Sequence, residues 1–238
     1  MMHPKLLRFA SIAALVAFSC AGLSAADQKK TFRDQLAEKL LACEYAFEVI
    51  MNKPDTAIPA QELQEAKGII IMRQVRAGLI VGGQGGSAVL ICRVPQNNNQ
   101  WGAPVFLDPG GVTFGLQAGV SEVNSVVLLN SDEAVRRAYT GRFDLGAAAG
   151  AVAGPRSAER DNSDLMKAPV RIYTSLGGAY AGATLKTGWI KPFDKANREL
   201  YRTPFATPEI AISNAFPVPP EAVGIRNRVL SAEQGASQ

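Results

Sequence analysis

The residue types that most often carry catalysis or bind metals are scarce in this sequence. His3 is the only histidine among 238 residues, and it lies in an N-terminal segment that we expect to be removed. Serine–histidine–aspartate triads and histidine metal sites then have no histidine available. The three cysteines form no C-x-x-C pair, and no serine is followed by a lysine three residues later. We predict a protein that is not an enzyme and that has no metal site and no cofactor.

A glycine-rich stretch is the most conspicuous local pattern. Gly83–Ala88 fits the G-x-G-x-x-A pattern of dinucleotide-binding turns. That turn needs a helix directly after it, because the helix N-terminus holds the pyrophosphate. Here the apolar run Ala88–Arg93 comes next, which indicates a strand. We therefore expect these glycines to permit tight bends or close backbone approach rather than to bind a nucleotide.

The N-terminus has the organisation of a secretory signal peptide. Two basic residues precede an apolar run from Phe9 to Phe18, and small residues continue up to Ala26. The run is too short to span a bilayer as a helix. We expect residues 1–26 to be cleaved and the protein to be exported, to the periplasm or to the outer membrane. The alternative is a lipoprotein that is lipidated at Cys20, within a segment that loosely matches a bacterial lipobox.

The remaining chain carries little net charge. Cleavage removes two of the 25 basic residues and none of the 21 acidic ones, which leaves a net charge of +2. We expect no nucleic-acid partner, since such a partner requires clustered lysine and arginine on one face. Cys43 and Cys92 stay in the chain, and they are either a disulfide in an oxidising compartment or small core residues.

A helix is predicted from Thr31 to Ile50. Thr31 is a suitable cap, and Asp34 places a negative charge at the positive end of the helix. Apolar residues recur every three or four positions, which gives one continuous stripe. The stripe consists of Phe32, Leu36, Leu40, Cys43, Phe47 and Ile50. It can either insert into a membrane surface or pack on the core of its own domain.

The middle of the chain is predicted to be strands. A connection at Arg76–Ala77 and a turn at Asp108–Gly111 separate some of them. Two short helices come after the strands, Asp194–Tyr201 and a second one that Thr207 caps. The fold class is α+β, with a mostly antiparallel central β-sheet, strongly curved or barrel-like, flanked by the N-terminal amphipathic helix and short C-terminal helices. One domain spans residues 27–216, and residues 217–238 form a C-terminal tail with room for one more short helix.

The chain resembles the SYLF domain family over Gln35–Ile212, nearly all of the sequence beyond the signal peptide. Segments that match in order and spacing are Ile58-Pro59, Ala66–Ile69, Arg76–Gly86, Trp101–Pro104, Gly111–Gly119, Leu129–Ser131, Ala153–Pro155 and Asp194–Tyr201. The resemblance implies lipid binding, because eukaryotic SYLF proteins bind phosphoinositides and some fungal members bind and bundle actin. Export would separate this chain from both, so we expect anionic lipid head groups as partners and do not expect actin.

Two groups of basic residues are candidates for lipid binding. They are Lys29, Lys30, Arg33 and Lys39 beside the first helix, and Lys67, Arg73 and Arg76 around the first strands. The function expected is a lipid-binding or membrane-surface-binding module of the cell envelope that is not catalytic. The alternative is a periplasmic structural or scaffold protein that contacts a protein partner of the envelope, with the polar loop Gly154–Lys167 as a candidate contact.

Overall fold

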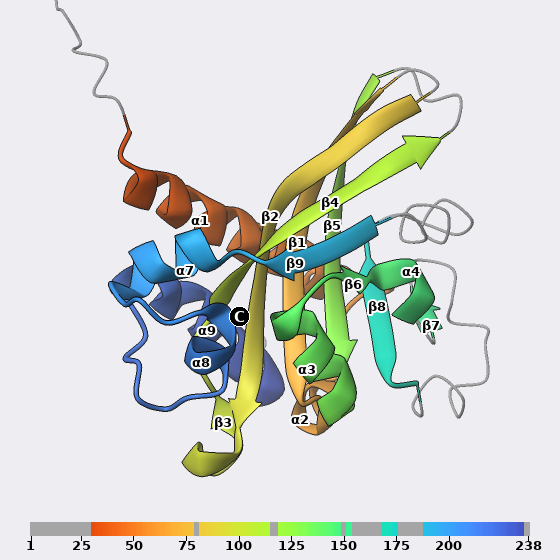
Figure 1. Ribbon diagram of the computed structural model, residues 1–238. Helices are drawn as coiled ribbons and strands as arrows, with labels where there is room; N and C mark the ends of the chain where they lie inside the picture. The colour runs from red at the N-terminus through yellow and green to blue at the C-terminus, as the bar shows by residue number, and fades with distance from the viewer. Residues whose placement is uncertain are drawn as a thin grey trace, which may run out of the picture. The chain divides into compact units, whose positions relative to one another are not determined.

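The computed structural model describes residues 30–78, 81–114, 119–148, 151–153, 168–175 and 188–235. The predicted signal peptide and the loop Gly154–Lys167 lie outside the described residues. Residues Thr31–Gln238 form one compact unit, which Figure 1 shows as a sheet with helices on both of its faces.

Helix α1 (Phe32–Met51) begins at the predicted cap. The Thr31 side-chain oxygen accepts a hydrogen bond from the Asp34 backbone N–H at 3.1 Å, and an Asp34 carboxylate oxygen accepts one from the Thr31 N–H at 2.9 Å. This reciprocal capping box satisfies two backbone donors that a helix start leaves without partners. The helix predicted over Thr31–Ile50 is therefore confirmed.

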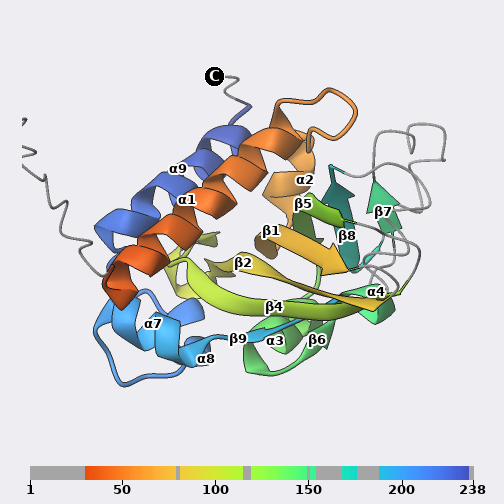
Figure 2. The ribbon, with the colours of Figure 1, turned by 90° about the horizontal axis from the view of Figure 1, so that it is seen from above.

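The strands form one sheet. They are β1 (Gly68–Gly78), β2 (Val81–Val94), β3 (Gln100–Trp101), β4 (Val105–Phe114), β5 (Gly119–Leu129), β6 (Phe143–Asp144), β7 (Ala151–Ala153), β8 (Val170–Thr174) and β9 (Gly188–Pro192). Their order is β6-β9-β4-β2-β1-β5-β8-β7, and β3 pairs with β2 outside this order. Among the described strands only the β7–β8 pair is parallel. The sheet curves into a half-barrel (Figure 2), so the predicted fold class is confirmed.

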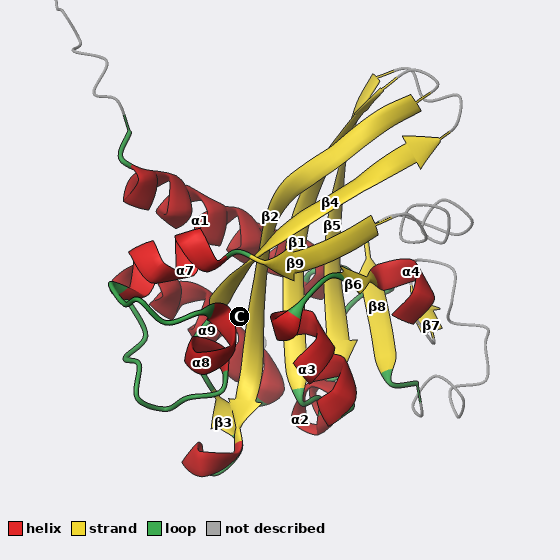
Figure 3. Ribbon diagram, in the orientation of Figure 1, coloured by secondary structure: helices red, strands yellow, loops and turns green. Residues whose placement is uncertain are grey.

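Helices cover the sheet on both faces. They are α2 (Ala60–Glu65), α3 (Asp132–Thr140), α4 (Leu145–Ala148), α7 (Asp194–Tyr201), α8 (Thr207–Ala211) and α9 (Pro220–Glu233), with a 3-10 helix η1 (Pro95–Asn97). Buried side chains of α1, α2, α7 and α9 form one apolar cluster, and those of α3, α4 and α8 form another. Figure 3 shows the strands in yellow and the helices in red. The central strands contribute side chains to both clusters, which explains the unbroken apolar run Ile69–Met72 in β1.

The two cysteines of the described chain lie on opposite faces of the sheet. Cys43 belongs to the α1 cluster, and Cys92 to the cluster under α3. Both are free thiols, and burial raises the pKa of each to about 12. The interpretation as small core residues is confirmed, and the disulfide alternative is wrong.

Two predicted connections are wrong. Arg76–Ala77 lies inside β1, where it pairs with β2 on one side and β5 on the other. Asp108–Gly111 lies inside β4, because all of it pairs with β9, as in the pair of Gly110 with Trp189, and Gly111 also pairs with Gln84 of β2. A neighbour supplied by a distant part of the chain overrides a local turn preference. The strand after the glycine pattern is confirmed, since Gly83–Ala88 lies within β2 and no helix comes directly after it.

The C-terminal helices differ in part from expectation. Helix α7 has the predicted bounds, but the residue that caps α8 is Ala206, and Thr207 lies within the helix. Residues 220–233, which we assigned to a tail, form α9. Its Ala222, Ile225 and Val229 are fully buried in the α1 cluster, so this helix is part of the domain core. The packing of α9 on α1 joins residues far apart in the chain, so the local sequence of residues 220–233 does not reveal it.

Candidate functional site

Two of the predicted basic residues come together where α1 crosses the sheet. The Lys39 ammonium donates a hydrogen bond to the Gly86 carbonyl oxygen in β2 at 3.2 Å. Arg73, in β1, pairs in register with Ser87, the next residue of β2. Its guanidinium lies 5.1 Å from the centroid of the Tyr45 ring on α1, which is a cation–π contact. Lys39 and Arg73 therefore belong to one surface, although 34 positions separate them in the sequence.

Exposed apolar side chains occur on the same two elements as these cations, and one of them, Tyr45, contacts Arg73. Tyr45 is 49% exposed, Leu41 is 62% exposed one turn before it, and Val75 is 46% exposed on the same face of β1 as Arg73. Large apolar side chains at this exposure are unusual when they adjoin one another. We call the surface formed by Lys39, Leu41, Tyr45, Arg73 and Val75 the α1–hairpin patch.

Arg73 is held by acidic and polar neighbours on β5. Its Nη2 donates to a Glu122 carboxylate oxygen at 2.6 Å, and this hydrogen bond lowers the pKa of Glu122. Asn124 donates to the other oxygen of Glu122 at 3.1 Å. Within the described part of the chain, Arg73 Nε and Asn124 Oδ1 are buried without a hydrogen-bond partner. The patch and the adjoining strand β5 thus each keep one buried atom with unused hydrogen-bonding capacity.

Arg33 is occupied by structural contacts. Its Nε and Nη2 donate to the two carboxylate oxygens of Glu221 on α9 at 2.6 and 3.0 Å. Its Nη1 donates to the carbonyl oxygens of Glu199 and Leu200 in α7, both at 3.1 Å. This guanidinium joins three helices, so its role in the fold is that of a clamp.

The other predicted cations are dispersed. Lys67 precedes β1 and pairs with Asp132 at 2.8 Å. It lies six positions before Arg73, a distance of about 20 Å along the strand. Lys30 is exposed just before the cap of α1. The backbone of Arg76 lies in β1, whereas its side chain, like all of Lys29, lies outside the described part. Of the seven candidates, the structure brings Lys39 and Arg73 together.

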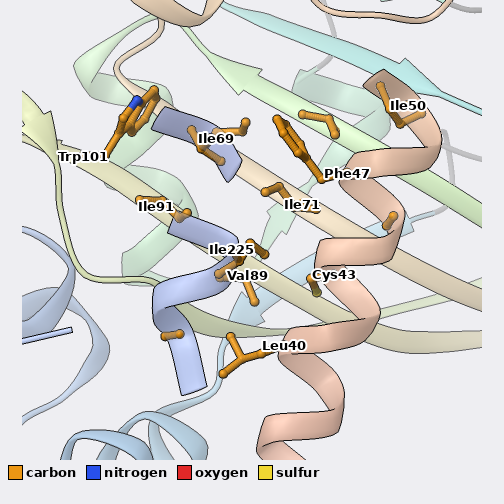
Figure 4. Packing of buried hydrophobic residues seen from close by; sticks show 14 of the residues in the cluster. Leu40, Cys43, Phe47, Ile50, Ile69, Ile71, Val89, Ile91, Trp101 and Ile225 are labelled. Atoms are coloured by element: carbon orange, nitrogen blue, oxygen red, sulfur yellow. The ribbon is translucent and has the colours of Figure 1, made fainter. Parts of the chain in front are cut away.

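The apolar stripe of α1 faces the interior of the domain. Leu36, Leu40, Cys43 and Ile50 are fully buried, and Phe47 is nearly so. Figure 4 shows Leu40, Cys43, Phe47 and Ile50 packed on Ile69 and Ile71 of β1, with Ile225 of α9 nearby. The alternative that the stripe packs on its own core is confirmed. Among the described residues, no helix is long and apolar enough to cross a membrane.

Several buried polar residues hold the fold together without having been singled out from the sequence. Asn197 of α7 accepts a hydrogen bond from the Phe106 N–H at 2.7 Å and donates to the Phe106 carbonyl oxygen at 3.0 Å. The side-chain amide thus continues the backbone pairing of β4 where β9 ends at Pro192. Asn197 falls on the same helical face as Leu200. A polar residue on the apolar face of a helix was the sequence signal that could have indicated this buried hydrogen-bonding role.

Two further networks join α2 to the sheet. Arg171 and Tyr173 of β8 both bind the Glu62 carboxylate, and burial raises the pKa of the Tyr173 hydroxyl. Arg93 of β2 donates to carbonyl oxygens at the end of α2 and to the Glu233 carboxylate at 2.6 Å. These groups bind one another within the fold, so we assign them to stability. Among the described residues, no three His, Cys, Asp or Glu side chains are grouped as metal ligands would be.

Comparison with known proteins identifies the family. Residues 110–232 match the family model Ysc84, described as "Las17-binding protein actin regulator". The chain is 32% identical to the bovine SH3 domain-containing YSC84-like protein 1 over 153 residues, which is 63% of this chain and 44% of that protein. It is 33% identical to Protein YSC84 of Saccharomyces cerevisiae over 173 residues, 71% of this chain and 36% of that protein.

The match covers this chain more fully than it covers these relatives. The chain spans less than half of the length of the curated relatives it matches. No solved structure matches it. The matched segment runs from β4 through most of α9, more than half of the sequence. The chain therefore belongs to the Ysc84 family, the family of SYLF-type domains that the sequence resembles.

Proposed function

We propose that this chain is a non-catalytic module that binds anionic membrane surfaces through its α1–hairpin patch. The observation that carries the proposal is that Lys39 and Arg73 meet where α1 crosses the sheet, with Arg73 in contact with the half-exposed ring of Tyr45. Each cation near an anionic surface contributes about 1 kcal/mol, and exposed apolar side chains add burial at the interface. The absence of histidine after residue 3 supports a binding role over catalysis.

The mode of binding depends on the packing of α1. Because the apolar stripe of this helix is buried, inserting it would require the core to open. The folded domain instead docks by its surface, with the outward side of α1 and the adjoining face of β1 toward the lipid. Lys67 and Arg33 are not part of this contact, since one lies about 20 Å along β1 and the other is clamped to Glu221.

The cellular location is part of the same proposal. The signal-like residues 1–26 support export to the periplasm or the outer membrane, and lipidation at Cys20 would provide a second attachment to the membrane. The intact mass of protein recovered from cell envelopes tests this. A mass that corresponds to a chain beginning at Asp27 indicates cleavage. A mass that corresponds to a chain beginning at an acylated Cys20 indicates a lipoprotein, and the mass of the unprocessed chain contradicts export.

A protein partner is the second candidate. The matching family model is described as a Las17-binding protein and actin regulator, and the bovine relative is named for its SH3 domain. Because of that description, we keep actin as a candidate partner of this chain and include it in the binding test.

Sedimentation with vesicles tests the membrane proposal. The purified protein is mixed with phosphatidylcholine vesicles that contain increasing phosphatidylglycerol, at low and at high salt. We expect the bound fraction to rise with anionic lipid and to fall with salt. Absence of binding to anionic vesicles at low salt would refute the proposal. A parallel sedimentation with actin filaments without lipid detects the second candidate, and binding there alone favours a protein partner.

A further inference from the structure

A cavity lies between the C-terminal halves of α1 and α9. These helices lie side by side (Figure 2), and the segment from Asn52 to Ala60 closes the space between their ends. The cavity has a volume of about 330 Å³. Its lining includes Phe47, Met51, Ile58, Arg228, Ser231 and Ala232. None of these residues belongs to the α1–hairpin patch.

The floor of the cavity is apolar and fixed. Phe47 and Ile58 are each 3% exposed and belong to the main core cluster, on which Met51 and Ala232 also pack. Gly235, whose φ of +70° suits glycine, ends α9 at the cavity. Because the floor is part of the core, the space exists without any unfolding of the domain, and an apolar group that enters it loses contact with water.

Two carboxylates pair with the Arg228 guanidinium at the cavity, Glu48 in the lining and Glu44 outside it. Arg228 Nε lies 3.3 Å from a Glu44 carboxylate oxygen, and its Nη1 pairs with Glu48. Two carboxylates thus face one guanidinium, which disfavours an anionic group at the mouth. Ser231 and Asn52 line the cavity and offer neutral donors and acceptors.

The volume limits the size of a ligand. It stands at the lower end of ligand pockets, which run from about 300 to 1,000 Å³. A lipid with two long chains does not fit in this space, whereas one chain of medium length does.

We propose that this cavity binds a single aliphatic chain of medium length that ends in an uncharged, hydroxyl-bearing group, the chemistry of a monoacylglycerol. The chain would lie on Phe47 and Ile58, and the hydroxyl group would reach Ser231 at the mouth. The proposal does not rest on the membrane function, since the two surfaces share no residue.

Calorimetric titration of the purified protein with 1-decanoylglycerol, below its micelle concentration, tests the site. We expect saturable binding of one molecule per chain. Ala232→Trp fills the cavity from α9, and Met51→Trp fills it from α1. Each should weaken binding by at least about tenfold, equivalent to about 1.4 kcal/mol. Asn227→Trp is the matched control, because it adds the same ring to α9 at an exposed position that does not line the cavity.

The charge of the rim gives a second comparison. Decanoate should bind more weakly than 1-decanoylglycerol, because its carboxylate meets Glu48 while Arg228 is already paired with two carboxylates. Equal binding of the two ligands would contradict the assignment. So would an absence of binding, or unchanged binding in both cavity variants while they keep the thermal unfolding midpoint of the wild type. Vesicle sedimentation of Ala232→Trp should be unchanged, so failure of this site can be told apart from failure of the membrane proposal.

Discussion

A Cβ atom added to Gly86 would lie 2.1 Å from the carbonyl oxygen of Arg73. No side chain fits at this distance, so the glycine allows β2 to approach β1 where the patch is formed. The Gly86 carbonyl oxygen, in turn, accepts the hydrogen bond of Lys39. Within the glycine-rich stretch, Gly86 thus contributes to the placement of both cations.

Gly86→Ala should destabilise the domain. The obstructing atom is backbone and cannot rotate away, so we expect a loss of roughly 1–3 kcal/mol in the free energy of unfolding. Urea denaturation followed by circular dichroism measures it. Gly83→Ala and Gly85→Ala on the same strand are controls, because an added Cβ at either position meets nothing within 4 Å. Equal losses in all three variants would contradict the steric explanation.

Removing the charge of Arg73 should weaken binding to anionic vesicles. We expect Arg73→Gln to cost about 1 kcal/mol, roughly a fivefold loss of partition, and Lys39→Gln to cost a similar amount. Lys67→Gln is the matched control, because it also removes a cation from an ion pair, at a site about 20 Å away. An equal effect at Lys67 would show that net charge, and not the patch, governs binding.

Asn197 should stabilise the domain through its hydrogen bonds to Phe106 at the start of β4. Asn197→Leu leaves the Phe106 N–H and carbonyl oxygen without their side-chain partner, so we expect a loss of roughly 2–4 kcal/mol in the free energy of unfolding. Asn197→Asp keeps the acceptor but loses the donor to Phe106 and Thr207. Chemical denaturation measures both, with Asn214→Asp as an exposed control. Wild-type stability in both Asn197 variants would contradict the role assigned to this amide.

Acid should release the clamp between α1 and α9. The hydrogen bond from Arg33 lowers the pKa of Glu221 below its ordinary value of 4.5. A carboxyl group with a lowered pKa in the folded state stabilises the protein above the unfolded value, and this contribution disappears as pH falls through the folded value. Glu221→Gln should therefore remove part of the stability at neutral pH, about 1 kcal/mol, and flatten the decline below pH 4.5.

Urea midpoints between about pH 6 and about pH 3 check this prediction. Glu209→Gln, on the exposed side of α8, is the control and should leave the profile of the wild type unchanged. A parallel decline in Glu221→Gln and wild type would show that other groups carry the acid sensitivity.

Local signals in the sequence were sufficient for several elements. Thr31 and Asp34 fix the start of α1 by hydrogen bonds across three residues, and its apolar period marks the buried face. Helix α7 also has the predicted bounds. The same kind of evidence placed the family and the mostly antiparallel sheet, because these depend on patterns that repeat along the chain.

The tertiary structure decided what depends on contacts between distant residues. Asp108–Gly111 has the local pattern of a turn, yet pairing with β9 makes it a strand. Arg33 and Lys39 look alike in the sequence, but Glu221, 188 positions away, binds the first, while the second reaches the patch. Charge and spacing determine which residues are able to form a surface. Which of these residues share one surface depends on strand pairing and side-chain packing between remote segments. The energy of those contacts cannot be read from any local stretch of the chain.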